Sequence, residues 1–158
     1  MSESREFVLR PVGFVRSPFG EVSQIPRGPG AEHRAEGRLE ILPEFEAGLQ
    51  DIEGFSHLFV IWVFHLSESY QLVSTPPTDD RAHGIFATRA PHRPCPLGLS
   101  VVELLGREGR YLLVRGVDMI EGTPILDIKP YLSSVPADKI RRGWLAEAEA
   151  RKAGQPSG

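Results

Sequence analysis

The sequence predicts a mainly β protein, either an antiparallel barrel or a sandwich. Short apolar segments recur along the chain at regular spacing, with turn-forming residues between them. Only residues 138–153 carry a long helical pattern, and strands and helices do not alternate as they would in a parallel sheet. With 158 residues and 41% hydrophobic content, the chain has the size and composition of one domain with its own core.

The expected strands follow one another with turns between them. Residues 7–15 end at a Ser-Pro-Phe-Gly turn, and residues 35–42 alternate roughly between polar and apolar side chains, as in a half-buried strand. Residues 58–65 form a β-branched and aromatic run, which predicts a strand buried on both faces. An Arg-Glu-Gly-Arg turn between the next two expected strands predicts a hairpin, and one more short strand is expected after it. These last three strands are expected at residues 99–105, 111–117 and 124–128.

Two segments predict helices. Residues 43–50 begin with a proline, which suits a first helical turn, and Glu44 and Glu46 favour the positive end of the helix dipole. Residues 138–153 have the spacing of a helix with one apolar face. That face is formed by Ile140, Trp144, Leu145 and Ala148.

The remaining segments predict loops. Residues 25–30 are rich in proline and glycine, and residues 69–81 combine Ser, Thr, Pro and Asp, which indicates an exposed loop. The terminal residues 154–158 are expected to be disordered.

Composition indicates a cytoplasmic protein. Cys95 is the single cysteine, which excludes an intramolecular disulfide and points to a reducing compartment. The N-terminal segment lacks the apolar core of a signal peptide, and the longest apolar run is too short to span a membrane. A net charge of −3 argues against a generally basic nucleic-acid coat protein, although it permits a local basic patch.

The segment from Gly84 to Gly98 carries the strongest indication of a binding site. Its three prolines, Pro91, Pro94 and Pro96, fix φ and remove backbone donors, so it cannot be a helix interior or a central strand. It is also too apolar and too constrained for a flexible linker. A stiff loop that carries two arginines and a histidine suits a small anionic or planar ligand; a rigid surface connector is the alternative.

A second polar cluster is expected between residues 122 and 131. Asp127, Lys129 and Tyr131 occupy alternate positions, and on an extended chain this spacing places all three side chains on one face. A carboxylate, an ammonium and a phenol on one face make a plausible polar site. The alternative is a solvated strand face with an incidental ion pair.

The histidines and the cysteine indicate neither a metal site nor a catalytic nucleophile. His57 and His65 bracket the apolar run within residues 54–65, where same-face placement follows from the two-residue period of a strand. With His83 and His92 they lack tight zinc-ligand spacing, so no metal is expected. Cys95 has no Cys-His-acid context that would indicate a nucleophile.

Five blocks in this order resemble the TsaA-like family, also called TrmO-like or YaeB-like and related to VirR, of S-adenosylmethionine-binding β-barrel proteins. The resemblance runs from about Val8 to Trp144, nearly the whole chain. The blocks are residues 12–19, 25–30, 54–65, 84–98 and 122–131.

This resemblance implies a small antiparallel β-barrel with a short internal helix and a C-terminal helix. Residues 1–135 would form the barrel domain, and residues 136–158 the terminal helix and tail of the same unit. The implied activity is S-adenosylmethionine-dependent methylation of the exocyclic amine of threonylcarbamoyl-adenosine beside a tRNA anticodon, carried out by a homodimer. A different methyl acceptor, or a non-catalytic cofactor-binding module, are the alternatives.

The resemblance also locates the site. It places the cofactor against the blocks that match 84–98 and 122–131, where Arg89 or Arg93 would pair with its carboxylate and Asp127 would bind its ribose or ammonium group. The cofactor-binding candidates are Arg27, Phe86, Ala87, Thr88, Arg89, His92, Arg93, Cys95, Leu97, Gly98, Asp127 and Lys129. The catalytic candidates are His65, Asp127 and Tyr131.

Two positions depart from the family pattern. Cys95 stands where the family usually has an asparagine, and Gly28 where many members have a glutamine, so two polar contacts near the cofactor are replaced. An anticodon loop presents unstacked bases to a shaped pocket, and basic residues on predicted loops could contact its phosphates. These are Arg16, Arg27, Arg34, Arg81, His83 and His92. The alternative is that they are scattered surface charges, because a charge count alone cannot place them on one face.

Overall fold

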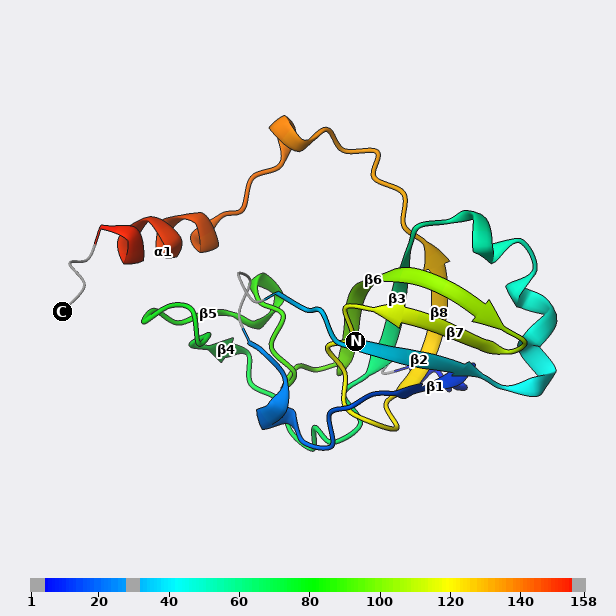
Figure 1. Ribbon diagram of the computed structural model, residues 1–158. Coiled ribbons are helices and arrows are strands. Elements are labelled where there is room, and N and C mark those ends of the chain that lie inside the picture. The colour runs from blue at the N-terminus through cyan, green and yellow to red at the C-terminus, as the bar shows by residue number, and fades with distance from the viewer. Residues whose placement is uncertain (1–4, 28–31, 155–158) are drawn as a thin grey trace.

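The computed structural model describes residues 5–27 and 32–154, and six of its strands form a closed antiparallel barrel (Figure 1). Their order around the barrel is β1-β2-β7-β6-β3-β8, and pairing of β8 with β1 closes the sheet. The strands are β1 (Gly13–Arg16), β2 (Glu36–Ile41), β3 (His57–Val63), β6 (Leu97–Glu108), β7 (Tyr111–Arg115) and β8 (Pro124–Pro130). The prediction of a mainly β, antiparallel barrel is confirmed.

The core fills the inside of this barrel. Alternate residues of each strand point inward, as the two-residue period requires. On β3 the inward residues are Leu58, Val60 and Trp62, all buried. The other strands contribute Val15, Leu39, Ile41, Val102, Leu112, Val114 and Ile125, and Leu49, Val117 and Met119 join them from outside the strands.

The outer face of β3 is half-buried rather than buried, so the prediction of a strand covered on both faces is wrong. The barrel covers one face only, and among the described residues the α-helix makes no extensive contact with β3 as helices do in a parallel sheet. Cross-strand pairing places Phe59 and Ile61 of β3 opposite Val101 and Leu99 of β6, on the outside. Leu99 is 51% exposed and Val101 43% exposed. We call these four side chains the outer apolar strip.

Several strand and helix bounds differ from the predicted ones. β1 begins at Gly13 instead of Phe7, because Pro11 has no N–H to donate to a ladder; Phe7 is 81% exposed. β6 extends three residues beyond the predicted 99–105, past a register shift between Leu104 and Gly106, while β7 is two residues shorter than predicted.

The helices are shorter than the sequence indicates. Residues 43–50 form a 3-10 helix, η2 (Pro43–Leu49), followed by η3 (Ile52–Gly54). The C-terminal helix α1 (Trp144–Ala153) starts six residues later than predicted, since Gly143 has φ 55° and ψ −138° and interrupts the helical pattern. Ile140 therefore lies outside the helix and is exposed. The tail from residue 155 onward lies outside the described residues.

A smaller unit lies beside one end of the barrel (Figure 1). It consists of the short strands β4 (Val73–Ser74) and β5 (His83–Gly84), which pair with each other, and of η4 (Ile85–Ala87). Residues 131–143, which include η5 (Ala137–Lys139) and which we call the strap, leave β8, are exposed throughout, and lead to α1. In Figure 1, α1 lies over β4 and β5. No helix within residues 5–27 and 32–154 is long and apolar enough to cross a membrane.

Replacing Gly98 with alanine is expected to destabilise the barrel by about 1–3 kcal/mol, the usual cost of overpacking a core. A Cβ at this position would overlap the indole of Trp62. Chemical denaturation measures the loss. Gly84→Ala is the matched control, because a Cβ there meets nothing within 4 Å. Equal stability of the two variants would contradict the packing described.

Candidate functional site

The loop from Gly84 to Gly98 is held rigidly at its start. Ile85 is 2% exposed, and its N–H donates to the carbonyl of Leu72. The hydroxyl of Thr88 donates to the carbonyl of Ile85 at 2.8 Å and accepts from the N–H of Ala90. Phe86, between them, is 79% exposed. The start of the loop therefore presents an aromatic side chain on a fixed backbone.

The middle of the loop is braced by Arg93. Its guanidinium donates to the carbonyl of Thr88 at 2.9 Å and to that of Ala90 at 3.2 Å. From outside the loop, Gln71 donates its N–H to the carbonyl of His92, and the Ser67 hydroxyl lies 3.0 Å from His92 Nδ1. Arg93 thus stabilises the conformation of the loop. Arg89, the other arginine of the loop, has an exposed side chain.

The end of the loop is fixed to the end of β3. Phe64 donates its N–H to the carbonyl of Pro96 at 2.8 Å, which continues the ladder between β3 and β6 by one step. Gly98 lies against the Trp62 indole, which donates to Ser100 at 3.0 Å. Ser100 in turn donates to Asp118 at 2.6 Å. Gly98 therefore has a packing reason to be glycine.

The second predicted cluster lies on the outside of β8. Lys129 Nζ is 3.1 Å from an oxygen of Asp127, whose other oxygen accepts the N–H of Ile128. The ring of Tyr131 lies 5.1 Å from that of Phe59, in edge contact. Since Phe59 pairs with Lys129 in the ladder, all three polar side chains share the outer face, as predicted.

The strand register decides which candidates come together in one chain. Ile61 pairs with both Leu99 and Asp127, so Asp127 lies two residues along β3 from Val63, where the loop joins β6. Tyr131 instead donates its N–H to the carbonyl of His57, at the other end of β3. At about 3.3 Å per residue this end is roughly 20 Å from the loop. A single chain therefore brings Asp127, but not Tyr131, close to the loop.

The other candidates lie around the loop or apart from it. His65 follows β3 and is exposed at the edge where Cys95 and Leu97 lie; Cys95 is exposed and free. Arg27 is exposed on the segment after η1 (Val22–Gln24), and Gly28 lies outside the described residues. Among the described residues no group of three or more His, Cys, Asp or Glu side chains could hold a metal ion.

A cluster that the sequence did not predict connects α1 with β5. His83 was expected to contact phosphate, but its ring stacks on Trp144 and its Nε2 lies 2.7 Å from Asp79. Hydrogen bonds from His83, and then from Arg151, hold the pKa of the Asp79 carboxyl well below its ordinary value. The spacing of Trp144, Ala148 and Arg151 was the available signal, since it places them on one face of a helix.

Two of the arginines expected to bind phosphate form ion pairs with carboxylates of the protein instead. Arg16 contacts Glu121 at 3.0 Å and Glu40 at 2.6 Å; these contacts raise the pKa of Arg16, and Arg16 with Tyr111 lowers the pKa of Glu40. Arg34 lies 2.6 Å from Glu32. The segment that contains the loop differs in its own composition, because no Asp or Glu occurs between Arg81 and Val102.

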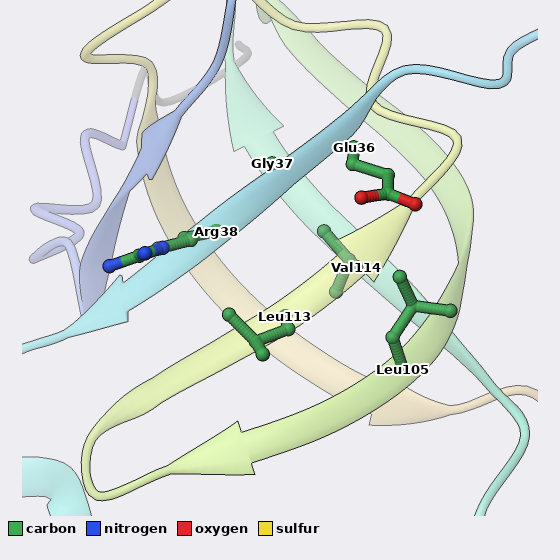
Figure 2. Close-up of a pocket in the computed structure, with 6 residues that line it drawn as sticks. All are labelled: Glu36, Gly37, Arg38, Leu105, Leu113 and Val114. Carbon is green, nitrogen blue, oxygen red and sulfur yellow. The ribbon is translucent and has the colours of Figure 1, made fainter.

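A shallow depression of about 280 Å³ lies on another part of the barrel (Figure 2). Leu105 and Leu113 lie beside each other on β6 and β7, while Glu36 and Arg38 extend from β2. None of the candidate residues lines it. The candidate site is therefore the open surface where the loop meets β3, not this depression.

The sequence model of the tRNA-methyltransferase O N-terminal domain matches residues 14–137. The chain belongs to this family. The resemblance recognised in the sequence is thereby confirmed, and the matched region contains the loop, the outer apolar strip and β8.

Relatives and solved structures agree with this family. A protein of Pyrococcus abyssi, named a probable S-adenosyl-L-methionine-binding protein, is 46% identical over 86% of this chain and 74% of its own length. The tRNA (adenine(37)-N6)-methyltransferase of Escherichia coli is 35% identical over 90% of this chain and 71% of its own. The crystal structure of TrmO from Pseudomonas aeruginosa superposes with a TM-score of 0.71 at 38% identity. It covers 88% of this chain, and this chain spans 62% of it.

Proposed function

We propose that this protein is an S-adenosylmethionine-dependent methyltransferase that modifies tRNA at the exocyclic nitrogen of threonylcarbamoyl-adenosine beside the anticodon. The observation that carries the proposal is the rigid, proline-rich loop at the end of β3, inside the matched family region. Relatives named as S-adenosylmethionine-binding proteins and as tRNA methyltransferases support it. The cytoplasm supplies both tRNA and the reducing conditions that suit Cys95.

The loop has the groups that S-adenosylmethionine requires. Backbone groups of the loop that make no bond within the protein can pair with the edge of an adenine, and Phe86 or Leu97 can pack on its face. Arg89 is the guanidinium available for the methionine carboxylate, because Arg93 is engaged by loop carbonyls. Asp127 has an oxygen oriented by Lys129 and suits a ribose or ammonium group. When bound, the cofactor supplies an activated methyl group on its sulfonium.

Catalysis of methyl transfer depends more on the alignment of donor and acceptor than on acid or base catalysis. The transfer is an in-line displacement, and holding donor and acceptor in line is worth about 7–11 kcal/mol in favourable intramolecular cases. The lone pair of the acceptor nitrogen is delocalised into the base, so a group that accepts its proton would help. Asp127 has a side chain that is 48% exposed, and it pairs with Ile61, two residues along β3 from the point where the loop joins β6; it is our candidate for this role.

We further propose a homodimer formed through the outer apolar strip. Exposed apolar side chains that lie together on a barrel surface, such as Leu99 and Val101, are typical of an interface between subunits. A second copy on this face would also cover the open side of the candidate site, next to Asp127.

Arg89→Ala and Arg93→Ala are expected to respond differently to two ligands. Loss of a charge-assisted bond to the carboxylate should weaken S-adenosylmethionine binding to Arg89→Ala about ten- to hundredfold. Binding of methylthioadenosine, which lacks the amino-acid end, should not change in that variant. Arg93→Ala should weaken both ligands, since it loosens the loop. Calorimetry measures the four affinities, and equal losses for both ligands in Arg89→Ala would contradict the carboxylate role.

Val101→Asp is expected to shift the protein from two chains to one, because it places a charge in the outer apolar strip. Light scattering coupled to size exclusion gives the mass. Phe45→Asp is the control, since Phe45 is 42% exposed on η2 and does not belong to the outer apolar strip. A dimeric Val101→Asp variant would place the interface elsewhere.

Labelled methyl transfer tests the activity itself. Two tRNA pools are compared, one bearing threonylcarbamoyl-adenosine and one from cells unable to make it. Label is expected only in the modified pool, and Asp127→Asn is expected to lower turnover about 100-fold or more. Label in both pools would indicate a different acceptor. Tight cofactor binding without label in either pool would indicate a binding module.

A further inference from the structure

The C-terminal helix contacts the rest of the molecule through one face. Trp144, Ala148 and Arg151 are spaced four and three residues apart, so they lie above one another on α1. Ala148 is 2% exposed. The strap before the helix is exposed throughout, so this face is what attaches α1 to β4, β5 and the turn between them.

One end of that face is attached through a buried carboxylate. Arg151 Nη2 lies 2.6 Å from one oxygen of Asp79, and His83 Nε2 lies 2.7 Å from the other. The N–H of Asp80 donates to the first oxygen at 2.9 Å. The side chain of Asp79 is 2% exposed, so its charge depends on these partners.

The other end is attached to the candidate cofactor loop itself. The ring of Trp144 stacks on His83, with centroids 4.1 Å apart and planes 15° from parallel. Its Nε1–H donates to the carbonyl of Ala87 at 2.8 Å. Ala87 lies between Phe86 and Thr88, in the part of the loop expected to meet the cofactor.

We propose that α1 is a positioning element for the cofactor loop, with Trp144 and Arg151 as its two positioning residues. Neither residue touches the cofactor; together they hold residues 79–88 in the conformation that binds it. This inference rests on the proposed cofactor site. It concerns residues beyond the matched family region, which ends at residue 137.

The need for such an element follows from the size of the β4–β5 unit. Its two strands have two residues each and pair only with each other. A two-stranded sheet is marginally stable in water without further packing. Without α1, the start of the loop would have to be ordered when the cofactor binds, and that ordering would weaken affinity.

Four variants test the inference: Arg151→Ala, Trp144→Phe, Trp144→Ala and Glu147→Ala. Calorimetry gives the S-adenosylmethionine affinity, tRNA methylation gives KM and kcat, and hydrogen exchange reports order in residues 79–90. Arg151→Ala is expected to raise the Kd and KM for the cofactor about fivefold at unchanged kcat, the scale of one lost hydrogen bond. Trp144→Phe keeps an aromatic ring that can stack on His83 but loses the N–H donor. Its effect should therefore be smaller than that of Trp144→Ala.

Glu147→Ala is the matched control, because Glu147 is exposed on the same helix, and it should leave all readouts unchanged. Faster exchange in Arg151→Ala or Trp144→Ala with unchanged Kd and KM would overturn the inference, since the helix would then only pack. Unchanged exchange would overturn it as well. Cofactor binding without methyl transfer to tRNA would contradict the proposed function but not this inference, whose primary readout is affinity.

Discussion

The contact between Gly98 and Trp62 determines where the candidate site is built. The indole occupies the space that any side chain at residue 98 would need, and its N–H is held through Ser100 by Asp118. This contact fixes the first residues of β6 against the end of β3, and the bond from Phe64 to Pro96 continues the attachment into the loop. The loop is thus an extension of the barrel wall, which gives it the rigidity that ligand alignment requires.

Rigidity is supplied to the loop from three sides. The barrel holds its end, Arg93 braces its middle from within, and α1 holds its start through Trp144. Two of these supports come from parts of the sequence outside the loop, and all three leave Phe86 and Arg89 exposed. Polar groups that are hydrogen-bonded within the protein support the site, and exposed groups are available to a ligand. The sequence alone does not distinguish Arg89 from Arg93, but the structure does, because Arg93 is bonded to loop carbonyls and Arg89 is exposed.

Local sequence patterns predicted where the strands lie better than they predicted which residues contact one another across the fold. Strand alternation and turn residues located six barrel strands, and the two-residue period placed Asp127 and Lys129 on one face. The sequence could not show that Tyr131 lies a strand length from the loop, because that depends on the register between β3 and β8. Nor could it show that His83 is paired with Asp79, since that bond depends on how a short loop folds back. Gly143 ended the predicted helical pattern through a backbone conformation that composition does not reveal.

S-adenosylmethionine is expected to bind where the proline-rich loop meets the end of β3. Hydrogen exchange of the protein with and without the cofactor tests this placement, because amides along the whole chain are followed at once. The account predicts slower exchange in residues 85–98 and around Asp127, with no change around Leu105 and Leu113. Protection confined to the depression between β2, β6 and β7, with the loop unaffected, would contradict it.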